Sequence, residues 1–66
     1  MYKITIQFDS FHVCSVWVDG YETDGLTISG WMGHKTNTMF VCFCDDNRRT
    51  YTVYQGDVCV SRSMNA

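Results

Sequence analysis

Cysteine and histidine carry the widest chemistry in this 66-residue chain, and a zinc site is the first use to consider for them. A structural zinc ion takes four thiolate or imidazole ligands, which usually come in pairs from tight turns of the C-x₂-C type. Cys42 and Cys44 are instead one residue apart, and on a strand their Cα atoms would lie about 6.5 to 7 Å apart, at the edge of disulfide geometry. We therefore expect no metal and no cofactor. The cysteine and histidine residues considered as zinc ligands are Cys14, Cys42, Cys44, Cys59, His12 and His34.

Nucleophilic catalysis is the second use, and His12 with Cys14 is the pair that a strand would place on one face. A catalytic thiolate needs a positively charged, partly exposed setting, whereas Cys14 is in line with Val16 and Val18. The chain also has no paired carboxylates, no glycine-rich phosphate loop and no H-E-x-x-H motif. We expect a protein that is not an enzyme.

The elements that must position these residues are strands and turns. Polar and apolar residues alternate from the N-terminus, β-branched and aromatic residues are frequent, and no segment has helical periodicity. The pattern predicts an all-β domain over residues 1–62, with residues 63–66 as a flexible tail. Its fold is a small antiparallel meander of five or six strands, rolled into a barrel or a compact two-layer sheet, with little or no helix. The expected strands cover residues 2–8, 12–19, a segment around Leu26 and Ile28, 39–44, 48–55 and a short stretch from 58.

Two hairpins are expected among these strands. Residues 2–8 pair with 12–19, and residues 39–44 pair with 48–55 across the polar turn Asp45-Asp46-Asn47, the strongest hairpin signal in the chain. In the last strand, Val58 and Val60 are expected to face the core and Cys59 to face out.

The segment Met39 to Cys44 is unusual because every position is apolar. An antiparallel strand in a small sheet normally has one face in water, so something else must cover the second face. We expect Met39, Val41 and Phe43 to point into the core with Tyr51 and Val53. Phe40, Cys42 and Cys44 then point outward beside Thr50, Thr52 and Tyr54. In the alternative, the sheet folds over itself and the same chain buries both faces.

An outward cluster of this kind predicts a protein-binding surface, either for a foreign partner or for a second copy in a homodimer. The proposed centre is Trp17, Phe40, Cys42 and Tyr54. Acidic residues are concentrated in the first half of the chain, and a rim that would meet basic protein surfaces is formed by Asp19, Glu22 and Asp24.

Binding of single-stranded nucleic acid is the alternative, because small barrels often stack bases on aromatic side chains while basic residues follow the phosphates. The candidate residues are Lys35, Arg48, Arg49 and Trp31, together with Arg62. Against this, Arg48 and Arg49 would balance Asp45 and Asp46 across their own turn, and the net charge of −2 attracts no phosphate at long range.

The N-terminal residues alternate, without the apolar run of a signal peptide or membrane span, so we expect a cytoplasmic protein with reduced cysteines. The general character, a tiny acidic all-β protein without catalytic groups, is similar to that of small inhibitors encoded by bacteriophages against host nucleases and CRISPR complexes. That resemblance implies a non-enzymatic module that docks on a macromolecular partner and modulates or inhibits it, in the host cytoplasm.

Overall fold

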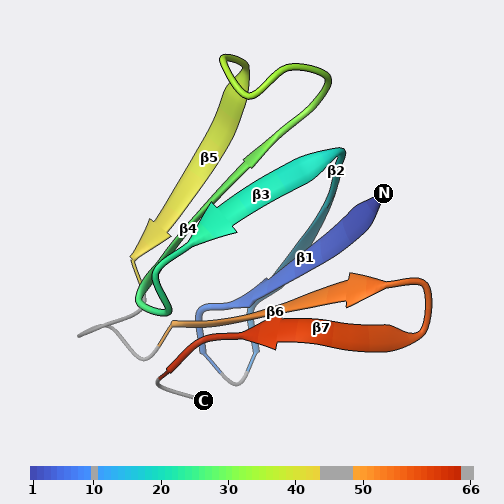
Figure 1. The fold of residues 1–66 in the computed structure, drawn as a ribbon. Coiled ribbons are helices and arrows are strands. Elements are labelled where there is room, and N and C mark those ends of the chain that lie inside the picture. The colour runs from blue at the N-terminus through green and yellow to red at the C-terminus, as the bar shows by residue number, and fades with distance from the viewer. Residues whose placement is uncertain (10, 44–48, 65–66) are drawn as a thin grey trace.

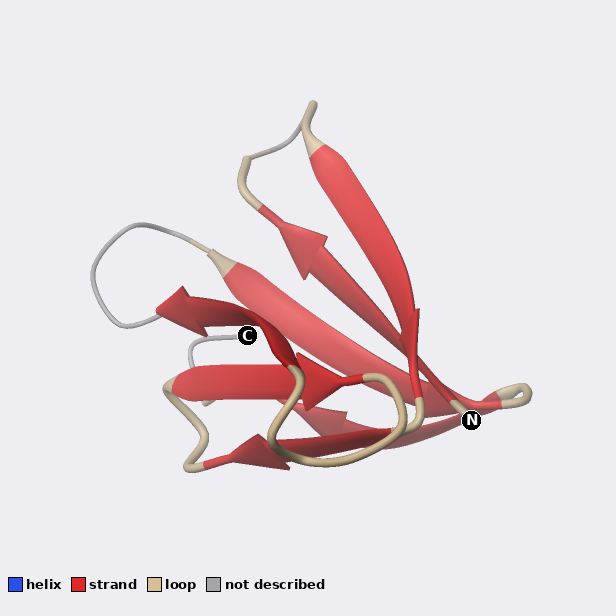
Figure 2. Cartoon of the chain, turned by 90° about the horizontal axis from the view of Figure 1, so that it is seen from above, coloured by secondary structure: helices blue, strands red, loops and turns tan. Residues whose placement is uncertain are grey.

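The computed structural model describes residues 1–9, 11–43 and 49–64, except for the side chains of Met39, Phe40 and Phe43. Within these ranges the chain forms strands and turns without a helix, which confirms the all-β prediction (Figures 1 and 2). The strands are β1 (Tyr2–Gln7), β2 (Val13–Val18), β3 (Gly20–Thr23), β4 (Thr27–Trp31), β5 (Thr38–Phe43), β6 (Thr50–Gln55) and β7 (Val58–Arg62).

The strands form two antiparallel sheets, so the expected two-layer arrangement is present and no closed barrel forms. One sheet has four strands in the order β2-β1-β6-β7, and the other has three in the order β3-β4-β5. Only Asp19 separates β2 from β3, and here the chain turns from the four-stranded into the three-stranded sheet (Figure 1). The Asp19 N–H donates to the Trp31 carbonyl at 2.9 Å, which holds this corner against the end of β4.

The core lies between the two sheets. As the alternating pattern predicts, β1 contributes Ile4 and Ile6 and β6 contributes Tyr51 and Val53, all of them buried. Burying each such aliphatic side chain stabilises the fold by about 1.5 to 3 kcal/mol. The full set of buried apolar residues is Ile4, Ile6, Val18, Ile28, Cys42, Tyr51 and Val53.

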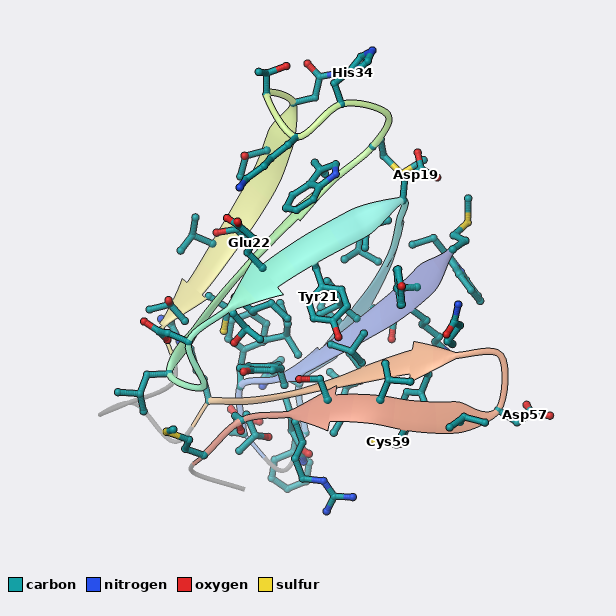
Figure 3. The ribbon with its side chains drawn as sticks, viewed as in Figure 1. Asp19, Tyr21, Glu22, His34, Asp57 and Cys59 are labelled. Atoms are coloured by element: carbon teal, nitrogen blue, oxygen red, sulfur yellow. The ribbon has the colours of Figure 1, made fainter. Side chains whose placement is uncertain are left out.

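Two contacts hold the sheets together at the edges of this core. The Tyr51 hydroxyl on β6 forms a hydrogen bond with the Thr23 hydroxyl on β3. The Tyr2 and Tyr21 rings pack edge to face with their centres 5.1 Å apart, and Figure 3 shows Tyr21 between β3 and the strands of the four-stranded sheet. Polar and aromatic contacts therefore supplement the small aliphatic core.

The chain after β7 returns to the three-stranded sheet. The Ser63 N–H donates to the Tyr51 carbonyl at 3.0 Å, and the Met64 N–H donates to the Gly25 carbonyl at 2.8 Å. Gly25 has a positive φ of 96°, and a side chain there would collide with that of Met64. Of the expected tail, Ser63 and Met64 thus form backbone hydrogen bonds, while residues 65 and 66 lie outside the described residues.

Strand pairing differs from the prediction in the second half of the chain. The expected hairpin of residues 39–44 with 48–55 is wrong, because β5 belongs to the three-stranded sheet and β6 pairs with β1 and β7. Pairing with β1 places Ile4 opposite Val53 and Ile6 opposite Tyr51, so that all four side chains bury on one face. The structure also adds β3, in a segment between two Asp-Gly pairs where no strand was expected.

The expected orientation of β5 is wrong at both positions where the side chains can be compared. Cys42, expected outside, is 4% exposed, whereas Val41, expected in the core, is 49% exposed. The cause is the register with β4, which places Cys42 opposite the buried Ile28 and hence on the inward face.

The last strand also differs. Val58 and Val60, expected in the core, are exposed, because β7 is an edge strand of the four-stranded sheet. Cys59 is half-buried and pairs with Tyr54, which places it on the outward face, as expected.

Candidate binding surfaces

The outer face of the four-stranded sheet, which points away from the three-stranded sheet, presents an aromatic and basic row. Lys3 on β1 lies between Trp17 on β2 and Tyr54 on β6, because it pairs with both. The Lys3 ammonium is 6.0 Å from the centre of the Trp17 ring, a cation–π distance. Trp17 is 54% exposed and Tyr54 is half-buried. The row Trp17-Lys3-Tyr54 therefore offers two ring faces and one positive charge to a partner.

The neighbouring row on this outer face is polar. Thr5 lies between Ser15 and Thr52, and its hydroxyl is 3.2 Å from that of Ser15. Thr52 in turn pairs with Arg62 on β7. Among the described strand residues of this face, the charged side chains are Lys3 and Arg62, and no carboxylate is present. The face is thus locally positive in a chain whose net charge is −2.

The predicted partner-binding cluster is divided by the fold. Trp17 and Tyr54 share one row, as the alternation along β2 and β6 implies. Cys42 lies on β5 of the other sheet and its side chain is part of the core between the sheets, so its assignment to an exposed cluster is wrong. The Phe40 side chain lies outside the described residues. Lys3 was missed because its role depends on the pairing of β1 with both β2 and β6.

The three acidic residues of the predicted rim lie on or beside β3, in the other sheet, and two of them hold the 32–37 loop (Figure 3). Asp19 accepts a hydrogen bond from the Gly33 N–H at 2.7 Å. Glu22 forms an ion pair with Lys35. Both carboxylates are thereby tied to contacts within the chain.

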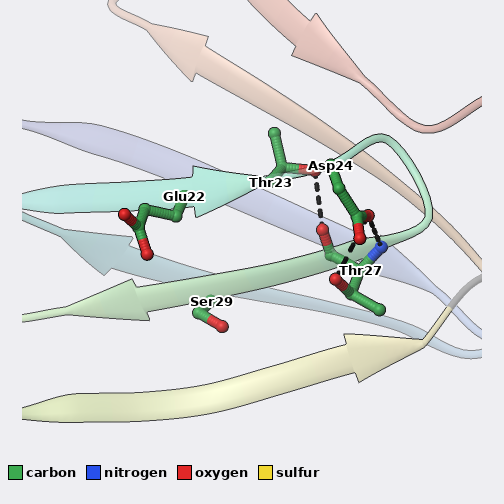
Figure 4. A pocket seen from close by; sticks show the side chains of 5 residues that line it. All are labelled: Glu22, Thr23, Asp24, Thr27 and Ser29. Atoms are coloured by element: carbon green, nitrogen blue, oxygen red, sulfur yellow. Dashed lines mark hydrogen bonds between the residues drawn. The ribbon is translucent and has the colours of Figure 1, made fainter.

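The third acidic residue, Asp24, shapes the turn between β3 and β4. Its carboxylate accepts hydrogen bonds from the backbone N–H of Thr27 at 2.8 Å and of Leu26 at 2.9 Å. These bonds lower the pKa of Asp24, because they stabilise the ionised form. Beside the turn is a shallow polar hollow of about 460 Å³ (Figure 4). It is lined by Glu22, Thr23, Asp24, Thr27 and Ser29.

The residues of the nucleic-acid alternative are also dispersed. The Lys35 ammonium, in the loop between β4 and β5, is 5.9 Å from the centre of the Trp31 ring at the end of β4, so these two residues lie together. The Trp31 ring in turn covers Gly20, where a Cβ atom would come within 2.6 Å of it. Arg49 is located elsewhere, with its guanidinium 5.4 Å from the Phe8 ring centre. Arg48 lies outside the described residues.

An apolar cleft of about 330 Å³ is a feature that the sequence did not reveal. Its lining residues come from both sheets and include one charged residue, Arg49. Because they are spread over several strands, the sequence of any one strand does not indicate the cleft. The cleft is lined by Ile6, Phe8, Cys14, Val16, Val41, Cys42 and Arg49.

Of the residues considered for catalysis and metal binding, His12 contacts Asp9, and Cys44 lies outside the described residues. The His12 Nδ1 atom is 2.8 Å from the Asp9 carboxylate, which also accepts the backbone N–H of Phe11 at 2.7 Å. The latter bond, with the His12 contact, lowers the pKa of Asp9. No hydrogen bond found between described residues joins His12 to Cys14. Within the same ranges, no three His, Cys, Asp or Glu side chains converge as ligands for a metal ion.

In comparisons with protein-family models, curated proteins and solved structures, the chain matches none. The part of the chain that the structure describes contains no helix of the length and apolar character needed to span a membrane.

Proposed function

We propose that this chain is a non-enzymatic protein-binding module that docks on a macromolecular partner through the outer face of its four-stranded sheet and modulates or inhibits that partner. The observation that carries the proposal is the row Trp17-Lys3-Tyr54, in which Trp17 is more than half exposed. Tryptophan and tyrosine are the residue types most enriched at the energetic centres of protein interfaces. The small acidic all-β character, similar to that of phage-encoded inhibitors, supports a partner of the host cell.

The rigidity of the sheet supports this role. Trp17 and Tyr54 lie on β2 and β6, which both pair with β1, so the paired strands fix the backbones that carry the two rings and little backbone entropy is lost on docking. Val13 extends the apolar part of the surface along β2. The partner that fits is a protein with an apolar depression for the Trp17 ring and an acidic group near Lys3.

A second candidate, binding of single-stranded nucleic acid, is favoured by one observation. The described charges on the outer face are the cations Lys3 and Arg62, beside two aromatic rings on which bases could stack. Arg62 was among the residues that the sequence suggested, whereas Trp31 is on β4 of the other sheet and Lys35 is in the loop that follows β4. A protein partner remains our first proposal because the net charge is negative and two cations give little counterion release.

Site-specific photo-crosslinking distinguishes these candidates. A benzophenone amino acid replaces Trp17 in one version of the chain and Phe11 in the other, and each version is irradiated in the cell that naturally makes the protein. Phe11 is the matched control because it is also aromatic and exposed but lies in the β1–β2 loop, away from the row.

A protein partner predicts one dominant adduct from position 17 that is absent from position 11 and is lost when Tyr54→Asp is added. An adduct of twice the chain mass identifies a homodimer, which is a partner of the same class. An adduct removed by nuclease establishes the nucleic-acid candidate instead. Equal adduct patterns from both positions contradict the proposal.

A further inference from the structure

Within the described residues, the inner face of the four-stranded sheet is covered at one end only. Along β1 and its continuation, the exposed fraction rises from 0% at Ile4 to 7% at Ile6 and 41% at Phe8. Along β2, on the same face, Val18 is buried, Val16 is half-buried and Cys14 is exposed. The apolar cleft lies over the uncovered end, so the three-stranded sheet is too narrow to cover the four strands below it.

The cleft opens along the outer edge of β5. Val41 and Cys42 both line it, although successive side chains of a strand point to opposite faces of the sheet. Two such neighbours can border one cavity only along the edge of their strand. β5 is the edge strand of its sheet, and its one partner among the described strands is β4 (Figure 1).

We infer that this edge and cleft form a docking site for an extended segment of another protein, which adds to β5 as a fourth strand of the smaller sheet. Main-chain hydrogen bonds to β5 would give the affinity, and alternate side chains would enter the cleft above Ile6, Cys14 and Val16. The segment Thr38–Phe43 contains no charged residue and no proline, the residues that usually protect an edge strand from pairing.

A second copy of the chain does not fit this edge. Antiparallel pairing of two β5 strands about a twofold axis keeps both four-stranded sheets on the same side of the joined sheet. Each four-stranded sheet extends past β5, because β1 and β2 residues line the cleft beside that edge. The four-stranded sheets of the two copies would therefore collide. A single extended segment carries no such second sheet and avoids the collision.

The lining defines the chemistry of the segment. It spans about six residues to match Thr38–Phe43 and has apolar residues at alternate positions. Arg49 is the charged residue of the cleft, stacked on Phe8, and no ion pair between described residues includes it. An acidic side chain or a free C-terminal carboxylate of the segment would therefore meet Arg49.

Two synthetic peptides test this inference, acetyl-TVTVTVD with a free carboxylate and acetyl-TVTVTVK with an amide end. Each is titrated to millimolar concentration against the whole chain, and the readout is the alkylation rate of each cysteine by mass spectrometry. We expect the acidic peptide to slow alkylation of Cys14 severalfold and to leave Cys59, on β7, unchanged. Replacement of the acidic end by the lysine amide should weaken binding about threefold to fivefold, the range for a partly exposed ion pair.

Three variants make the test specific. Val41→Lys places a charge on the edge strand and should abolish the protection of Cys14. The matched control, Val60→Lys, changes a valine of similar exposure on the edge strand of the other sheet, and should retain the protection. Arg49→Glu should reverse the preference, so that the lysine peptide binds better.

Absence of Cys14 protection by either peptide overturns the inference, as does an equal loss in the Val41→Lys and Val60→Lys variants. A dimer of the chain alone that Val41→Lys dissociates also overturns it, because a second copy would then occupy the edge. The outer-face proposal is independent of this outcome, since the two surfaces share no residue.

Discussion

The hydrogen bond between Tyr51 and Thr23 joins the two sheets and provides a direct test of the fold. The Thr23 hydroxyl donates to the Thr27 carbonyl at 2.7 Å. It therefore accepts the hydrogen bond from Tyr51, whose ring is fully buried. Thr23 also accepts the Gly25 N–H at 3.0 Å, so one hydroxyl organises both the turn after β3 and the contact between the layers.

The two ends of this bond should differ in what their removal costs. Tyr51→Phe removes the donor hydroxyl. The acceptor, the exposed Thr23 hydroxyl, keeps its two other hydrogen bonds, so the free energy of unfolding should fall by about 1 kcal/mol. Thr23→Val leaves the buried Tyr51 hydroxyl unpaired and removes both turn bonds, which should cost about 2 to 3 kcal/mol. The double variant should cost less than the sum, because the unpaired hydroxyl is then absent.

Thermal and urea unfolding of the three variants measure these differences. For a domain of this size, 1 kcal/mol corresponds to a Tm shift of about 4 to 8 °C. Thr5→Val is the matched control, because its hydroxyl bond to Ser15 is exposed, and we expect a change within about 0.5 kcal/mol. The reasoning is refuted if Thr23→Val is no more destabilising than Tyr51→Phe, or if the two effects add.

Two further predictions concern a buried hydroxyl and an ionised turn. Ser63 is buried, and its hydroxyl has no hydrogen-bond partner within the described part of the chain, so Ser63→Ala should raise Tm by several degrees; a lower Tm in the same scan contradicts this. The pKa of Asp24 is lowered from 3.8, so its ionised form stabilises the fold above about pH 4, and this contribution is lost as pH falls through the folded-state pKa. The stability difference between the wild type and Asp24→Asn should therefore shrink below pH 4, and a difference constant from pH 7 to pH 2 in urea titrations would rule this out.

The sequence predicts β1 and β2 well because polar residues there mark one face of each strand. Thr5 between Ile4 and Ile6 assigns the inward side of β1, and the burial of both isoleucines confirms it. The polar Ser15 likewise helps place Trp17 on the outside of β2. Where polar and apolar residues alternate along a strand, only one orientation buries the apolar face, because a slip of one residue would bury the polar side chains instead.

The same reasoning fails for β5 because its residues do not distinguish the two faces. From Met39 to Phe43 no position is polar, so both orientations bury apolar side chains equally well and the register with β4 decides between them. Ile28 on β4 fixes that register, and it is not adjacent to Cys42 in the sequence. That β5 does not pair with β6 also depends on residues far apart in the sequence. By pairing with β1, β6 places Val53 opposite Ile4 and Tyr51 opposite Ile6.

The apolar character of β5 therefore has a different meaning from the one that its sequence suggested. An all-apolar strand implies that both faces are covered, but Val41 is exposed and Cys42 is buried by the chain itself. Among the described residues, the apolar cleft lies at the edge of this strand, beside the inner face of β1 and β2. The described strands form a four-stranded and a three-stranded sheet, and the apolar residues Phe8, Val16 and Val41 border the cleft between them. An extended segment at this position would bury apolar side chains and satisfy backbone groups at once.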